Sequence, residues 1–203
     1  MLQRDCLATA PTLPRASLEL DCSRALRENL VRRSCTLMIN SELSLRLARL
    51  ADADSIATLS RDFIEYGLSW RWTPVRVAAS IRAVNVNVLV ASMHNEIAGF
   101  AIMRYGDDDA HLDLLAVTPP YRRSGIGRQL LEWLEECAVV AGIFNVDLEV
   151  RAGNEEAQLF YSRMGYRTLL QLPGYYQGVE AALRMRRDLS RRSLDQRTHR
   201  EQS

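Results

Sequence analysis

A strand, an arginine–glycine turn and a helix follow one another between residues 112 and 142, and this unit constrains the fold more than any other part of the chain. The mostly apolar stretch at 112–117 predicts a strand. An amphipathic pattern from Leu130 to Ala141, followed by Gly142 at the expected C-cap position, predicts a helix. The segment that joins the two elements is therefore the first place to look for function.

The joining turn has the sequence RRSGIGR at residues 122–128. Glycines beside a helix start leave backbone N–H groups open and let an anion approach closely, while the helix dipole favours negative charge there. The turn lacks the Lys-Ser/Thr ending of a P-loop and the first glycine of the dinucleotide Gly-x-Gly-x-x-Gly pattern. It therefore predicts a cradle for a diphosphate that is neither of these two common loops.

The spacing Arg-x-x-Gly-x-Gly after a strand that ends in Ala-Val resembles the coenzyme A pyrophosphate loop of the GNAT (GCN5-related N-acetyltransferase) superfamily. Residues 144–151 alternate apolar and polar, which predicts a strand with one buried face. Residues 154–166 predict a short helix that is capped by Asn154 and ended by Gly165. The order Leu-Glu-Val-Arg, Asn, Phe-Tyr and Gly-Tyr is similar to the second half of that superfamily's core.

The rest of the chain is consistent with the same layout. Further strands are predicted at 43–50, 86–93, 97–104, 166–172 and 180–187, and helices from 52 to about 66 and from 73 to about 83. The resemblance implies an α/β (α+β) GNAT fold: a mixed, mostly antiparallel, twisted sheet of about seven strands with four helices and splayed central strands. We expect residues 43–189 to form this domain and 190–203 to be a basic disordered tail. Residues 1–42 are expected to be a disordered extension, or the biological start is Met38.

Composition excludes several classes of protein. A chain of 203 residues is one domain by length, and its formal net charge of +1 argues against bulk nucleic acid as a partner. The four cysteines show no C-x-x-C pairing, so we expect neither a disulfide nor a metal, and a cytoplasmic location. No apolar run approaches the ~20 residues needed to cross a membrane.

The resemblance implies that acetyl-CoA is the co-substrate. The strand before the loop would then bind the pantetheine arm and polarise the acyl carbonyl through the backbone of Leu115, Ala116 and Val117. The pyrophosphate would meet the loop, largely through its N–H groups. The loop residues implied are Arg122, Arg123, Ser124, Gly125, Ile126, Gly127 and Arg128.

Tyr161 is the predicted catalytic acid. It lies seven residues after Asn154, nearly two helical turns, so both side chains project from one face about 10 Å apart. In the superfamily the matching tyrosine protonates the coenzyme A sulfur, and the matching asparagine contacts the pantetheine arm. The alternative is that Tyr161 packs in the core. We expect Phe160 to be the core residue of the two, because a ring without a hydroxyl is easier to bury.

The general base has two candidates on the predicted strands. Glu149 matches the base of the ribosomal-protein alanine N-acetyltransferases, which the chain resembles most in its motifs, and we favour it, acting through water. His111 and Asp113 alternate onto the same strand face, at the positions where arylalkylamine acetyltransferases place two histidines. An ordinary polar strand face is the remaining interpretation of both sets.

The acceptor site is expected at Tyr175, Tyr176 and Trp70. The tyrosine pair follows Gly165-Tyr166 with a spacing similar to that of the ribosomal alanine enzymes, although Pro173-Gly174 and a shorter hairpin depart from their pattern. The predicted function is acetyl-CoA-dependent N-acetyl transfer to a primary amine, such as a protein or peptide N-terminus. Two alternatives stay open: a small-molecule amine acetyltransferase, and a non-catalytic acyl-CoA-binding module.

Overall fold

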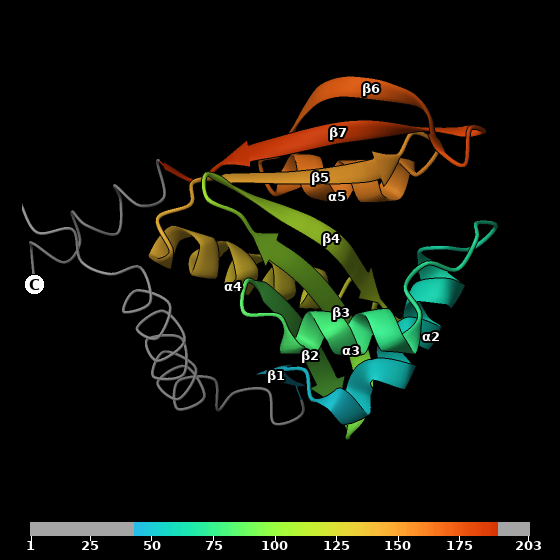
Figure 1. The fold of residues 1–203 in the computed structure, drawn as a ribbon, viewed down its shortest axis with the longest axis vertical. Coiled ribbons are helices and arrows are strands. Elements are labelled where there is room, and N and C mark those ends of the chain that lie inside the picture. The colour runs from blue at the N-terminus through green and yellow to red at the C-terminus, as the bar shows by residue number, and fades with distance from the viewer. Residues whose placement is uncertain (1–42, 191–203) are drawn as a thin grey trace, which may run out of the picture. The chain divides into compact units, whose positions relative to one another are not determined.

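A computed structural model describes residues 43–190, which form a seven-stranded sheet flanked by helices (Figure 1). The strands are β1 (Leu43–Leu47), β2 (Val86–Met93), β3 (Glu96–Tyr105), β4 (Asp109–Val117), β5 (Asn145–Arg151), β6 (Arg167–Tyr176) and β7 (Glu180–Asp188). The helices are α2 (Ala53–Phe63), α3 (Pro74–Arg82), α4 (Ile126–Val140) and α5 (Glu155–Arg163), with 3-10 turns η1 (Leu50–Asp52) and η2 (Pro119–Tyr121). The expected N-terminal extension and the tail beyond residue 190 lie outside the described residues.

The sheet has the strand order β1-β2-β3-β4-β5-β7-β6. Every neighbouring pair is antiparallel except β4 and β5, which are parallel. The expectation of a mixed, mostly antiparallel sheet of about seven strands with four helices is confirmed for the described residues.

Three predicted boundaries moved. The first strand ends at Leu47 rather than residue 50, because the Asp52 carboxylate accepts hydrogen bonds from Arg46 and from the Arg49 N–H and pulls the chain into η1. The first helix ends at Phe63 rather than near residue 66. Strand β6 continues to Tyr176, past a register shift, where a turn was expected after residue 172.

Helices cover both faces of the sheet. Phe100 of β3 packs in a core cluster with Ile56 of α2 and Val77 of α3. The next residue back, Gly99, faces the other way: a Cβ there would lie 3.4 Å from side-chain atoms of Ile126 in α4. Adjacent residues of a strand point to opposite faces, so α4 packs on the face opposite α2 and α3.

The central strands β4 and β5 are paired over only part of their length. Their parallel pairing extends from Asp109 to Leu112 of β4 and stops there. At the same place the β3–β4 register shifts between Ile102 and Met103, which leaves Asp113 as an extra residue in β4. A bulge of this kind bends a strand, so β4 turns away from β5 beyond Leu112. Figure 1 shows the two strands diverging, and the predicted splay is confirmed.

Candidate active site

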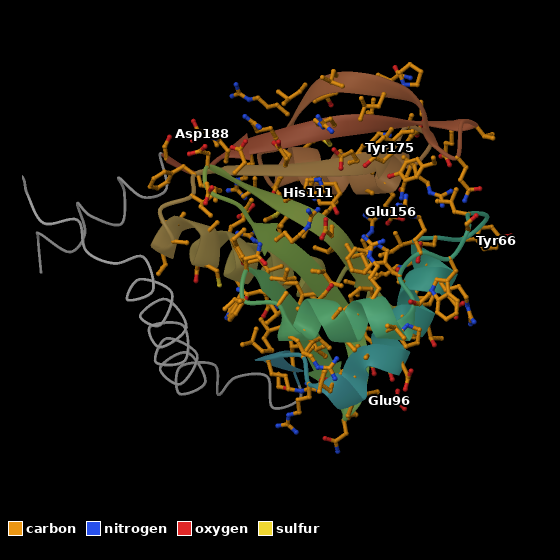
Figure 2. All side chains as sticks on the ribbon, in the orientation of Figure 1. Tyr66, Glu96, His111, Glu156, Tyr175 and Asp188 are labelled. Atoms are coloured by element: carbon orange, nitrogen blue, oxygen red, sulfur yellow. The ribbon has the colours of Figure 1, made fainter. Side chains whose placement is uncertain are left out.

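A cavity of about 750 Å³ occupies the region where β4 and β5 separate. Its walls come from both strands, from α5, from the loop between α2 and α3, and from the turn between β6 and β7. Three of the residues that line it are labelled in Figure 2: Tyr66 after α2, His111 on β4 and Tyr175 near the end of β6. One side of this cavity is lined by Leu115, whose side chain lies beside Gly127 of the loop, and the other carries a chain of charged side chains.

Beyond the splay, one edge of β4 is left without a neighbouring strand. The Thr118 N–H donates to the Ala98 carbonyl of β3 at 2.9 Å. Because backbone groups alternate sides along a strand, those of Ala116 also face β3, whereas those of Leu115 and Val117 face the side that β5 has left. Of the three backbone positions expected to bind the coenzyme arm, Leu115 and Val117 are therefore the two that face the open side, and a contact of any of the three with the arm stays a prediction.

The start of α4 has no side-chain cap. The N-cap residue is Gly125, which has no side chain, and the preceding Ser124 donates its hydroxyl to the Tyr121 carbonyl at 2.5 Å. Gly125 has φ = 85°, in the left-handed region that glycine adopts without strain. The first helical bond runs from the Gln129 N–H to the Gly125 carbonyl, so the N–H groups of residues 126–128 are left available to an anion.

Gly127 lies where β4, α4 and α5 converge. A Cβ at this position would sit 3.6 Å from side-chain atoms of Phe160 and Val117 and 3.7 Å from Leu115. A methyl group would make ordinary contacts there, but a long side chain would fill the space beside the uncapped helix start. The residues present therefore fit a diphosphate at the helix start with an arm continuing along β4.

The three arginines of the loop are exposed and surround this helix start. Arg122 donates to the Val117 carbonyl at 3.2 Å, and its guanidinium lies 5.7 Å from the Phe63 ring centre. Arg123 lies 3.4 Å from Glu156, which is labelled in Figure 2, and Arg128 pairs with Glu132 at 3.0 Å. These contacts hold positive charge near the proposed anion site.

Tyr161, not Phe160, is the buried member of the aromatic pair, so the expectation that Phe160 would be the core residue is wrong. Tyr161 is 8% exposed, packs edge-to-face against Tyr166, and lines the cavity. In residues 43–190, every fully buried side-chain polar atom has a hydrogen-bond partner. The Tyr161 hydroxyl forms no hydrogen bond within these residues, so it is not fully buried and opens onto the cavity. Burial, with a smaller effect from Tyr176, raises its pKa above the ordinary value, so it keeps its proton.

Asn154 caps α5, as expected from the sequence. Its Oδ1 accepts a hydrogen bond from the Ala157 N–H at 3.0 Å, and the residue also lines the cavity. The cap anchors the start of the helix that carries Tyr161. A direct contact between Asn154 and a coenzyme arm stays a prediction.

The two competing candidates for the base are parts of one hydrogen-bonded chain. His111 Nε2 lies 2.8 Å from Glu149 Oε2, and His111 Nδ1 lies 2.9 Å from Asp113 Oδ1. Arg104 donates to both Asp113 oxygens, at 2.6 and 2.8 Å, and Arg184 donates to Glu149 Oε1 at 2.8 Å. The order is therefore arginine, aspartate, histidine, glutamate, arginine across four neighbouring strands.

Charge within this chain is mutually stabilised. Hydrogen bonds from His111 to Asp113 and Glu149 outweigh burial and raise the pKa of the imidazole to about 9. The pKa of Glu149 is lowered, first by the His111 hydrogen bond. Burial pushes the pKa of Asp113 upward, but Arg104 and His111 together outweigh it and lower the value. At neutral pH the site thus holds an imidazolium between two carboxylates, and these groups titrate as a unit.

Arg104 and Arg184 were missed by the sequence reasoning. Arg104 is the register partner of His111 in the β3–β4 pair, and Arg184 is the partner of Glu149 in the β5–β7 pair. Arg184 and Glu149 are opposite charges directly across a strand pair. Arg104 instead reaches the carboxylate of Asp113, two residues from its register partner. Both pairings are a recognisable signal only once the register is known.

Arg151 links the two walls of the cavity on the acceptor side. Its guanidinium donates to the carbonyls of Ile64 at 3.0 Å and Tyr66 at 2.9 Å, and to Glu180 at 2.9 Å. It also lies 5.3 Å from the Tyr176 ring centre. The loop after α2 and the start of β7 are therefore held by one side chain.

The expected acceptor residues are only partly brought together. Tyr175 and Tyr176 line the cavity, with their ring centres 5.1 Å apart in an edge-to-face arrangement. Trp70 does not line it, and its ring is covered by the Arg61 guanidinium at 5.5 Å. Trp72 takes the lining position, because the Glu65 carboxylate accepts the Trp72 N–H at 3.1 Å and turns the loop inward.

Comparison with known proteins agrees with this geometry. Residues 85–168 match the family model described as acetyltransferase (GNAT) domain. The aminoalkylphosphonate N-acetyltransferase of Salmonella typhimurium is 30% identical over 129 residues, which cover 61% of this chain and 84% of that protein. The chain belongs to the GNAT family.

Other acetyltransferases match this chain over fewer residues or at lower sequence identity. The ribosomal protein bS18-alanine N-acetyltransferase of Salmonella typhimurium is 37% identical over 94 residues, or 45% of this chain and 64% of that protein. The first curated relatives are matched over less than two-thirds of their length, 57–64%. The crystal structure of the Escherichia coli ribosomal-protein-S18-alanine N-acetyltransferase has a TM-score of 0.63 at 26% identity and covers 72% of this chain and 93% of that one.

Two features are absent from the described part of this GNAT domain. In residues 43–190 no group of three or more histidine, cysteine, aspartate or glutamate side chains is arranged to hold a metal ion. No helix in the same part of the chain has the length and apolar character needed to cross a membrane.

Proposed function

We propose that this chain is an acetyl-CoA-dependent N-acetyltransferase that acts on a primary amine. The observation that carries the proposal is the junction of two features: an uncapped helix start beside the open edge of β4, and a cavity that continues from this edge to the His111–Glu149 pair. Family membership supports it. One relative is named as a ribosomal-protein alanine N-acetyltransferase, which supports a protein N-terminus as acceptor. Another is named as an aminoalkylphosphonate N-acetyltransferase, which supports a small amine.

On the donor side, the N–H groups of residues 126–128 and the loop arginines would hold the diphosphate. The backbone groups of Leu115 and the Val117 N–H would bind the arm that follows and orient the acyl group. Acetyl-CoA, when bound, supplies a thioester carbonyl that an amine can attack. The backbone groups are fixed in advance by the fold, which is what makes such donors effective.

On the acceptor side, we assign the general base to Glu149, acting together with His111. Glu149 alone is a weak base because its pKa is lowered. The adjoining imidazole has a pKa of about 9, above the ~8 of an α-amino group. The pair can therefore hold the proton that leaves the amine nitrogen, directly or through water, and activity should rise with pH as His111 becomes neutral.

Tyr161 is the proposed acid for the departing sulfur. Its hydroxyl faces the cavity and keeps its proton at neutral pH, because burial raises its pKa. It can donate this proton, or a hydrogen bond, to the thiolate as it forms. Tyr175 and Tyr176 form the acceptor wall. We further propose a cytoplasmic location, since the cysteine spacing shows no disulfide framework.

The proposal is tested by measuring acetyl-CoA binding by calorimetry and thiol release with a panel of amines and N-terminal peptides. We expect binding, and thiol release that depends on the amine. Binding without release for any amine would favour the acyl-CoA-binding module instead, and absence of both would reject the proposal.

A further inference from the structure

The cavity lining carries more cationic than anionic side chains. Its three carboxylates belong to Glu65, Asp113 and Glu149, and its five guanidinium groups to Arg71, Arg76, Arg104, Arg151 and Arg184. Asp113 pairs with Arg104, and Glu149 pairs with Arg184. Glu65 is only 7% exposed and accepts hydrogen bonds from backbone N–H groups. The carboxylates of the lining are therefore all engaged.

Two of the guanidinium groups are not neutralised. Arg151 pairs with Glu180, but Arg71 and Arg76 form no ion pair with a carboxylate within residues 43–190. Arg76 lies over the Trp72 ring, with its guanidinium carbon 4.1 Å from the ring centre, and this stacking holds it beside the cavity. With the His111 imidazolium, the acceptor side has a positive potential.

The position of Arg71 is set by the fold. Its N–H donates to Glu65 Oε1 at 2.8 Å, which anchors the start of the side chain in the loop between α2 and α3. Arg71, Tyr175 and Glu149 all line the same cavity. A molecule whose amine lies at Glu149 therefore shares this cavity with Arg71.

We infer that the acceptor is an amine that carries an anionic group, such as a carboxylate or phosphate, near the reacting nitrogen. Arg71 and Arg76 bind the anionic group while the amine lies at Glu149. A polyamine or an N-terminus followed by a basic residue would bring a second cation against the unpaired guanidinium groups and would be rejected. The inference rests on the proposed function and narrows its substrate class.

The test uses matched acceptors that differ only in charge. The peptide pair is Ala-Glu-amide and Ala-Gln-amide, and the small-amine pair is β-alanine and β-alaninamide. Thiol release at saturating acetyl-CoA gives kcat/KM for each. We expect the anionic member to be preferred about fivefold or more, because each exposed ion pair contributes up to ~1 kcal/mol. The preference should lie in KM and should fall as ionic strength rises.

Variants assign the preference to the arginines. Arg71→Gln should bring the anionic-to-neutral ratio close to one, and Arg71→Glu should reverse it. Arg82→Gln, in the last turn of α3 and outside the cavity, should leave it unchanged. Calorimetry of the same acceptors with the full chain saturated with coenzyme A measures the preference without turnover.

The outcomes separate the inference from the proposed function. Equal use of both members of each pair, or a preference that survives Arg71→Gln, overturns the inference. Anion-selective binding that depends on Arg71, without thiol release, upholds the inference and rejects the acetyltransferase function. A preference seen only in the peptide pair assigns the anionic group to an acidic residue of a peptide acceptor. A preference seen only in the small-amine pair assigns it to a free amino acid.

Discussion

The donor and acceptor sides of the cavity are built in different ways. The proposed donor side is one continuous segment, from Leu115 to Arg128, and it would act through backbone N–H and C=O groups. The acceptor side consists of side chains from β3, β4, β5 and β7, joined through His111 and Glu149. A backbone site depends on local conformation, whereas a side-chain site depends on how distant strands are aligned. The two sides should therefore fail in different ways when residues are replaced.

The largest effect is expected at the donor side, from Gly127→Glu. The new side chain fills the space beside Leu115, Val117 and Phe160 and places a negative charge at the anion site. Acetyl-CoA affinity, measured by calorimetry, should fall roughly 100-fold or more. Gly127→Ala is the matched control, because its methyl group would make only ordinary contacts and should keep most of the affinity. Unchanged affinity in folded Gly127→Glu would contradict the assignment of the donor side.

Tyr161→Phe should affect turnover and spare coenzyme binding. The ring packing is kept and only the hydroxyl is lost, so kcat should fall by about 10²-fold. Tyr166→Phe is a suitable control: Tyr166 is also buried, but its hydroxyl donates to Glu135 at 3.0 Å, away from the cavity. That variant should lose stability and keep kcat. If both variants retain full turnover, Tyr161 is not the acid.

On the acceptor side, Glu149→Gln and His111→Gln should act as one unit. Each should lower kcat/KM by about tenfold or more, and the double variant should be little worse than either single one, because the two groups share one proton-holding function. We expect the rate of the wild type to rise toward pH 9 as His111 loses its proton. Both variants should flatten this rise. Independent, multiplying losses would show that the hydrogen-bonded pair does not work as a pair.

The smallest effect concerns stability and pH. The pKa of His111 is raised from 6.5 to about 9 on folding. Its stabilising contribution is therefore complete below pH 6.5 and is lost as the pH rises through about 9. Wild type should exceed His111→Asn in melting temperature by roughly 2–4 °C at pH 6, after allowing for its partial exposure, with the gap closing by pH 10. A gap that does not change with pH would mean that His111 contributes packing alone.

Residues that act locally could be predicted from the sequence. Asn154 caps α5, and α4 begins after Gly125 without a side-chain cap, and both the cap and the open helix start were expected from residue type and spacing alone. Glu149 and His111 were also identified, but as rivals, because nothing in the sequence places residue 111 beside residue 149. Trp70 was expected at the acceptor site, but Trp72 lines the cavity, because the direction of that loop depends on the buried Glu65.

The sequence by itself determined the order of the elements and the donor loop, since hydrophobic period, glycine conformation and helix capping act over a few residues. Only the tertiary structure decided where β4 leaves β5, that Tyr161 is buried instead of Phe160, and that Arg104 and Arg184 complete the charged chain. The physical reason is register. Which side chains meet across a sheet depends on hydrogen-bond alignment and a single bulge at Asp113, and a shift of one residue would turn each side chain to the other face.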